Sequence, residues 1–139
     1  MILLDTDRVS VLANPGGARG ERLSARLRAV TGTPVTIPII AVEEQMRGWM
    51  SSIAKERHVE RQVSSYRRLA YLFEFFTQFQ IAAFDDAAAA RFETLSAVRV
   101  GTMDLKIAAI ALSTGALLLT ANRRDFERVP GLTFDSWLE

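Results

Sequence analysis

The sequence contains no cysteine and a single histidine, His58. The absence of cysteine excludes disulfide bonds, thiolate-bound zinc, iron–sulfur clusters and a cysteine nucleophile. One histidine excludes a metal site built from several imidazole rings. A metal bound by side chains of this protein would therefore be held by oxygen ligands, which favour Mg²⁺ or Mn²⁺ over zinc.

Long apolar runs and targeting signals are also missing. Runs such as Ile107–Leu112 are far shorter than the ~18 residues of a membrane span. The N-terminal MILLDTD has no basic segment and reaches Asp5 too early for a signal peptide, so we expect a cytoplasmic protein without a membrane partner. Lysine is scarce, because 15 of the 17 basic residues are arginine, and the net charge is +1. This balance is too even for electrostatics alone to predict a nucleic-acid binder.

The chain has 139 residues, 49% of them apolar, which is enough for one hydrophobic core and excludes a disordered chain. We therefore expect a single domain, 1–139. Strand-like apolar runs alternate with helical patterns, which predicts an α/β fold of three layers with a central parallel sheet flanked by helices. The predicted strands are 1–4, 35–40, 81–84, 116–119 and 132–134. The predicted helices are 8–13, 21–30, 41–57, 60–79, 86–97 and 103–114, with turns at 14–17 and 31–34.

Acidic residues recur where the predicted strands end. Asp5 directly follows the first strand, and Glu43 and Glu44 follow the second. Asp125 lies just past the fourth strand, and Asp104 lies in the first turn of the helix that leads into it. Ligands of open parallel sheets bind beyond the carboxyl ends of the strands. We therefore expect these acids to meet at one edge of the sheet.

A group of carboxylates in one cleft indicates a hard cation, because the carboxylates repel one another without it. Mg²⁺ or Mn²⁺ accepts oxygen ligands, retains several waters and activates water for displacement at a phosphodiester. Each acid taken alone has a simpler explanation. Asp5 can cap the helix that follows it, and Asp85 and Asp86 are expected as an N-cap and a first-turn residue. The metal prediction therefore depends on the whole group.

Four segments follow one another from residue 2 to residue 132: ILLDTD, AVEEQMRGW, VGTMDLKIAAIAL and GALLLTANRRDFERVPGL. In this order they resemble the PIN-domain ribonucleases and, among them, the VapC toxins of bacterial toxin–antitoxin pairs. The resemblance covers nearly the whole chain. The first segment alone is common, whereas the last two together are specific. The resemblance implies a three-layer PIN-like fold.

The resemblance also implies four acidic site residues, which are both catalytic residues and metal ligands. Asp5 corresponds to the acid after the first strand, and Glu44 to the glutamate four residues before a glycine, here Gly48. Asp104 is the aspartate of the G-T-x-D-L segment, and Asp125 is the last acid of the T-x-N-x-x-D-F segment.

Three supporting residues follow from the same motifs. Asn122 stands where family members carry Asn or Asp, and the hydroxyls of Thr102 and Thr120 are expected to orient water or carboxylates. Thr102 is also the predicted cap of the helix 103–114. Glu43 remains the alternative to Glu44, because helical geometry puts Glu43 nearer the apolar face. Asp7 stands where many members have asparagine, so the pattern does not require its charge.

The implied activity is that of a Mg²⁺-dependent endoribonuclease, with Mn²⁺ possible as the ion. The implied partners are an RNA substrate, a second copy of the chain in a homodimer, and a cognate antitoxin whose tail covers the active site. The aromatic helix 60–79 is predicted to contribute to the dimer, although it is equally explained as core. The residues themselves indicate metal and phosphodiester chemistry. RNA, toxicity and the antitoxin come from the resemblance alone.

Two other functions fit parts of the pattern. Asp5-Thr6-Asp7 after an apolar strand also occurs in haloacid-dehalogenase-like phosphatases, where the first aspartate is the nucleophile. That chemistry needs a positioned lysine, and the two lysines, Lys55 and Lys106, do not follow predicted strands. A non-catalytic α/β binding domain is the third possibility, and the retention of all four acids argues against it.

Overall fold

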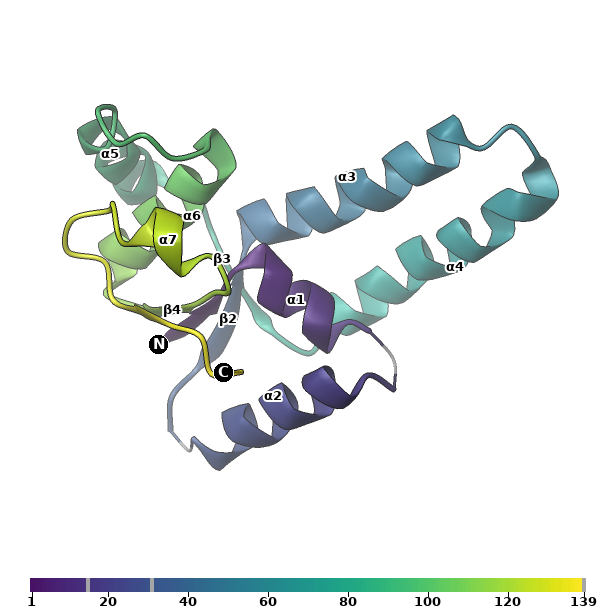
Figure 1. Cartoon of the computed structure of the whole chain (residues 1–139), viewed down its shortest axis with the longest axis horizontal. Coiled ribbons are helices and arrows are strands. Elements are labelled where there is room, and N and C mark those ends of the chain that lie inside the picture. Colours follow the sequence, from purple (N-terminus) through teal and green to yellow (C-terminus); the bar gives the residue numbers. More distant parts are fainter. Residues whose placement is uncertain (15, 31, 139) are drawn as a thin grey trace.

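The computed structural model describes residues 1–14, 16–30 and 32–138; Pro15 and Thr31, in the predicted turns, lie outside them together with Glu139. Its strands form one parallel five-stranded sheet in the order β3-β2-β1-β4-β5. Helices cover both faces of this sheet (Figure 1). The predicted three-layer α/β fold is thereby confirmed.

The strands are β1 (Ile2–Leu4), β2 (Val35–Pro38), β3 (Gln80–Ala82), β4 (Leu117–Leu119) and β5 (Phe134–Asp135). The helices are α1 (Thr6–Leu12), α2 (Ala18–Ala29), α3 (Ile39–Lys55), α4 (Val59–Phe76), α5 (Asp86–Thr94), α6 (Thr102–Thr114) and α7 (Arg123–Phe126).

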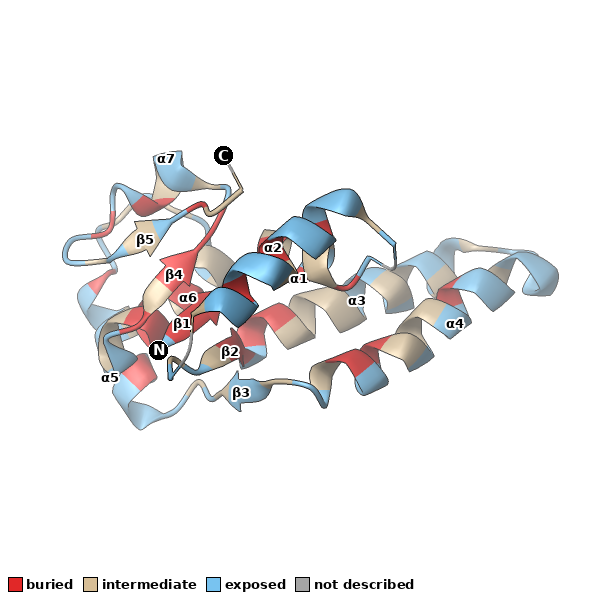
Figure 2. Cartoon of the chain, turned by 90° about the horizontal axis from the view of Figure 1, so that it is seen from below, coloured by how far each residue is buried: buried red, intermediate tan, exposed pale blue. Residues whose placement is uncertain are grey.

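The central strand β1 separates two hydrophobic cores. Successive strand residues point to opposite faces, so Leu3 packs against α5, α6 and α7, whereas Ile2 and Leu4 pack against α1, α2 and α4. All three residues are at most 2% exposed. Figure 2 shows the buried positions gathered in β1, β4 and the adjoining helices. This burial explains why β1 is an uninterrupted apolar run, as expected for a parallel strand covered on both faces.

Helix α6 is buried more completely than one amphipathic face would require. Ile107 and Ile110 are fully buried, as are the alanines between them. The small alanine side chains allow the helix to lie close to the sheet, where it forms the centre of the first core. The helix ends at Gly115, whose φ of 68° is the left-handed conformation predicted for a glycine after a helix. Thr102 is not the cap as predicted, because Gly101 occupies that position and Thr102 is the first helical residue.

The α3–α4 hairpin projects away from the sheet (Figure 1). The strand predicted at 35–40 ends at Pro38, and α3 begins directly with Ile39. Proline lacks an amide hydrogen and its φ is restricted near −65°, which suits the position before a helix better than the interior of a sheet. At the other end of the chain, the strand predicted at 132–134 begins only at Phe134, because the turn still includes Leu132, whose amide donates to Val129. In the described residues, no helix is both long enough and apolar enough to cross a membrane.

Candidate active site

Asp5 lies at the carboxyl end of β1 and is the most deeply buried acid of the site, with 4% of its surface exposed. Its Oδ1 accepts a hydrogen bond of 2.8 Å from the Thr6 amide and so caps α1. Its Oδ2 accepts a hydrogen bond of 2.6 Å from Thr120 Oγ1, which follows β4. The capping explanation is therefore confirmed, and the same side chain also contacts the residue that follows β4.

Burial raises the pKa of Asp5 to about 7, because the charged carboxylate loses its hydration there. The hydrogen bonds from Thr120 and Thr6 act in the opposite direction, and the negative charges of Asp7 and Asp104 add to the increase. The Asp5 carboxylate thus occupies a place where a nearby cation would lower its pKa and stabilise its charged form.

Glu44 turns towards Thr6 and Asp104, and Glu43 turns away. Thr6 Oγ1 donates a hydrogen bond of 2.6 Å to Glu44 Oε1, which links the start of α1 to α3. Glu43 forms an ion pair with Arg47 on the outer surface of α3. The geometry therefore brings Glu44, and not its alternative, to the edge of the sheet where Asp5 lies.

Asn122 connects the two remaining acids. Its Nδ2 lies 2.9 Å from Asp125 Oδ2 and 3.4 Å from Asp104 Oδ2, so one amide group contacts carboxylates from α7 and α6. Burial raises the pKa of Asp104, and the charges of Glu44, Asp125 and Asp7 raise it further, while the Asn122 hydrogen bond opposes them. Asp104 therefore lies within electrostatic range of the three other predicted acids, although the four come from separate segments.

The loop between β4 and α7 holds these groups in place. Thr120 is fully buried, and its Oγ1 also accepts a hydrogen bond of 2.9 Å from the Asn122 amide. Phe126, directly after Asp125, is fully buried in the first core. Burying a phenylalanine contributes about 1.5–3 kcal/mol, so this side chain fixes the short helix that carries Asp125.

Three residues in or beside the motifs differ from the expectation. Thr102 is exposed, and no hydrogen bond of its side chain is found within the described chain, so the structure does not join it to the acids. Thr6 was missed as a site residue, although it stands between two aspartates in the sequence DTD. Asp7 accepts from the Ala121 amide at 3.2 Å and contacts Thr120 Oγ1 at 3.4 Å, which adds a fifth carboxylate to the site.

The donor set fits a hard divalent cation. The side chains that converge are carboxylates, hydroxyls and a carboxamide, and the mutual repulsion at Asp104 is the cost that a cation would remove. In the ranges that the structure describes, no three acidic side chains already enclose one point as metal ligands. Mg²⁺ needs only one or two carboxylates because it retains several waters. The arrangement is thus compatible with such an ion.

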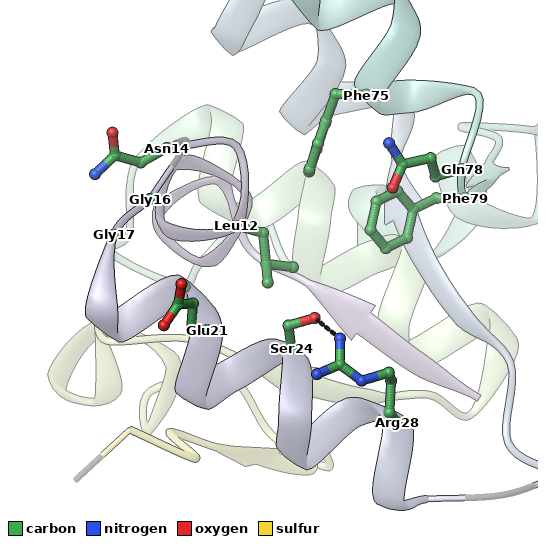
Figure 3. A pocket seen from close by; sticks show the side chains of 11 residues that line it. Leu12, Asn14, Gly16, Gly17, Glu21, Ser24, Arg28, Phe75, Gln78 and Phe79 are labelled. Atoms are coloured by element: carbon green, nitrogen blue, oxygen red, sulfur yellow. Dashed lines mark hydrogen bonds between the residues drawn. The ribbon is translucent and has the colours of Figure 1, made fainter.

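A cavity of about 500 Å³ lies elsewhere in the molecule, between α2 and the end of α4 (Figure 3). Its wall combines the apolar side chains of Leu12, Phe75 and Phe79 with the Ser24–Arg28 hydrogen bond of 2.7 Å. None of the predicted acids lines this cavity. The acidic edge of the sheet is therefore a separate feature.

The chain has recognisable relatives. It is 31% identical over 84 residues to the tRNA(fMet)-specific endonuclease VapC of Salmonella typhimurium, and this match covers 56% of the chain and 64% of the relative. The structure resembles VapBC2 of Rickettsia felis bound to a promoter DNA fragment, with a TM-score of 0.77, 22% identity and 99% of both chains covered.

It also resembles DNA-bound VapBC of Salmonella typhimurium, with a TM-score of 0.76, 26% identity, and coverage of 98% of this chain and 97% of that one. The family model described as the PIN domain matches residues 2–132, which include all four predicted acids. The chain belongs to the PIN domain family.

Proposed function

We propose that this protein is a Mg²⁺-dependent endoribonuclease that acts as the toxin of a VapC-type toxin–antitoxin pair, with Mn²⁺ as a possible substitute ion. The observation that carries the proposal is the repulsion at Asp104, where negative charges from α3, α7 and α1 meet beside one carboxylate. A cluster of this kind is stabilised by a divalent cation and suits the anionic backbone of RNA. Membership of the PIN domain family and the VapC relative support a nuclease.

The proposed roles follow from the position of each side chain. Asp5 and Asp104 are the best-placed metal ligands because burial and neighbouring carboxylates make their charges costly without a cation. Glu44 and Asp125 complete the catalytic set. When bound, the ion activates water and stabilises the charge that develops on the phosphodiester.

The supporting groups orient these carboxylates. Thr120 donates to Asp5, and Asn122 donates to Asp125 and Asp104, so each fixes a carboxylate oxygen before substrate arrives. Thr102, at the start of α6, is proposed to contact water or RNA rather than a carboxylate, because it is exposed.

The proposed protein partners are an antitoxin and a second copy of the chain. The solved VapBC complexes support the antitoxin.

For the homodimer we propose the apolar groove of about 400 Å³ between α3 and α4, which is lined by residues that include Val42, Met46 and Phe73. Phe73 is 58% exposed, and exposed apolar patches of this kind mark interfaces. Light scattering of wild type and Phe73→Glu tests this: a dimer that the substitution makes monomeric is expected, and a monomeric wild type contradicts it.

Incubation of the purified protein with total RNA tests the proposed activity. We expect new RNA ends in Mg²⁺, none in EDTA, and recovery when Mg²⁺ is restored. Asp125→Asn should abolish cleavage in the same assay, whereas Asp135→Asn, at an exposed aspartate of β5, should not. Full cleavage in EDTA would refute the metal-dependent mechanism, and intact RNA in every condition would refute the nuclease.

A further inference from the structure

Arg8 is a charged side chain buried almost completely, with 1% of its surface exposed. Removing a guanidinium from water costs several kcal/mol unless its partners compensate for the lost hydration. The partners of Arg8 therefore decide what this residue contributes.

Two of its contacts reach a distant part of the chain, and a third is with the preceding residue, Asp7. Nε donates to the Ser136 carbonyl oxygen at 3.1 Å, and Nη2 lies 3.0 Å from Ser136 Oγ. Nη1 lies 3.5 Å from Asp7 Oδ1. The contacts with Ser136 are neutral and anchor the C-terminal segment, whereas the contact with Asp7 is ionic.

Asp7 links the Arg8 guanidinium to the acidic edge of the sheet. Its carboxylate accepts from the Ala121 amide and contacts Thr120 Oγ1, which in turn donates to Asp5. The negative charge of Asp7 acts on both Asp5 and Asp104. A neutral asparagine at position 7 would not impose this charge, so the acidic centre of this chain contains one carboxylate more than the motif requires.

We propose that Arg8 is a positioning residue of the acidic centre: its buried guanidinium, anchored by Ser136, compensates for the charge of Asp7 and so holds the Asp7–Thr120–Asp5 contacts together. Arg8 thereby performs in the metal-free protein part of the compensation that a divalent cation supplies when bound. The inference rests on the proposed function only where it refers to that cation.

A purely structural role makes a different prediction, and Arg26 is the matched control. Arg26 also holds the C-terminal segment, because its Nη1 lies 3.3 Å from the Trp137 carbonyl oxygen and its guanidinium lies 4.7 Å from the centre of the Trp137 ring. No contact of Arg26 with Asp7 or Asp5 is found in the described residues. Loss of either arginine weakens the anchor, but only loss of Arg8 leaves Asp7 uncompensated.

Thermal melting of the full chain in EDTA and in Mg²⁺ separates the two roles. Arg8→Met should melt below wild type in EDTA, and Mg²⁺ should raise its melting temperature by about 3–5 °C more than it raises that of wild type. Adding Asp7→Asn to Arg8→Met should recover the part of the lost stability that is due to Asp7 in EDTA, but not the part due to the Ser136 anchor, and should remove the extra effect of Mg²⁺. Arg26→Met should melt lower in both conditions with the wild-type response to Mg²⁺.

The EDTA comparison decides the inference without any metal. If Asp7→Asn gives no recovery in the Arg8→Met background, Arg8 does not act through Asp7 and the proposal is wrong. If Arg8→Met does not fold, recovery of folding in the double variant supports the proposal and continued unfolding overturns it. A wild type that Mg²⁺ does not stabilise would refute the metal proposal, and would leave the result in EDTA for Arg8 unaffected.

Discussion

Thr6 Oγ1 and Glu44 Oε1 are 2.6 Å apart, so the first turn of α1 and the first half of α3 meet through one hydrogen bond at the acidic edge of the sheet. The bond fixes which of two consecutive glutamates faces the acidic edge. Glu43, the other glutamate, pairs with Arg47 one helical turn further along the outer face of α3. The pair Glu43 and Glu44 therefore offers a test in which the same change is made at adjacent positions with different surroundings.

We expect Glu44→Gln to lower RNA cleavage by about 10–100-fold or more, because the neutral amide is a weaker ligand for a divalent ion. Folding should be unaffected, since the amide oxygen can still accept from Thr6. Glu43→Gln should cleave as wild type does. Cleavage rates in Mg²⁺, with melting temperatures as a control for folding, measure both. The reverse order of effects would assign the catalytic role to Glu43.

Asp104→Asn separates a structural role from a catalytic one. Asp104 lies in the first turn of α6, where a negative charge is worth about 0.3–1 kcal/mol, but its carboxylate is also repelled by Glu44 and Asp125. We expect the metal-free variant to melt at the wild-type temperature or above, and to lose RNA cleavage. Asp86→Asn, in the first turn of α5, should instead melt slightly lower and cleave normally. An Asp104→Asn protein that melts lower yet still cleaves RNA would remove Asp104 from the site.

The raised pKa of Asp5 predicts how metal-free stability depends on pH. Folding changes its pKa from 3.8 to about 7, so between these values the folded chain binds a proton that the unfolded chain has released. Stability associated with Asp5 therefore falls as pH rises through this window, by about 1.4 kcal/mol per unit of pKa. Asp5→Asn cannot ionise, so in EDTA its melting temperature relative to wild type should be higher at pH 8 than at pH 5. Parallel curves for the two proteins would contradict the prediction.

Two glycines in helices predict opposite effects of the same substitution. A Cβ at Gly20 would lie 2.6 Å from the Val11 carbonyl oxygen, a backbone atom of α1 that cannot move aside. We expect Gly20→Ala to cost about 1–3 kcal/mol of stability. Gly48, in the exposed face of α3, has nothing within 4 Å of such a Cβ, so Gly48→Ala should stabilise the protein by about 0.4–1 kcal/mol. Urea unfolding with equal m-values measures both differences, and equal effects at the two positions would contradict the packing of α2 on α1.

The apolar pattern was sufficient to predict the strands and most helices, because buried strands and amphipathic faces have characteristic periods. The family motifs predicted the acids that the fold brings together. Neither could decide between Glu43 and Glu44, since adjacent helical residues differ by about 100° in direction and the choice depends on how α3 lies against α1. The contact between Thr6 and Glu44 is tertiary and has no local signal.

The projecting hairpin shows a second limit of the sequence pattern. The helical spacing in the sequence predicts Met50 on one apolar face with Val42 and Met46, yet Met50 is 55% exposed. The period of α3 is unchanged, but its outer half extends beyond the sheet that would cover it (Figure 2). A helical period predicts which residues share a face, and it does not predict how far along the helix that face finds a partner.

The pairing of β1 with β4 has a consequence for the order in which the protein assembles. Asp5 and Thr120 are separated by 115 positions, so β1 can pair with β2 early but meets its other neighbour, β4, only after most of the described chain has been made. Contacts this distant in sequence form late and slow folding. A nascent or truncated chain that stops before Asp125 therefore lacks a complete acidic centre, however well its helices have formed.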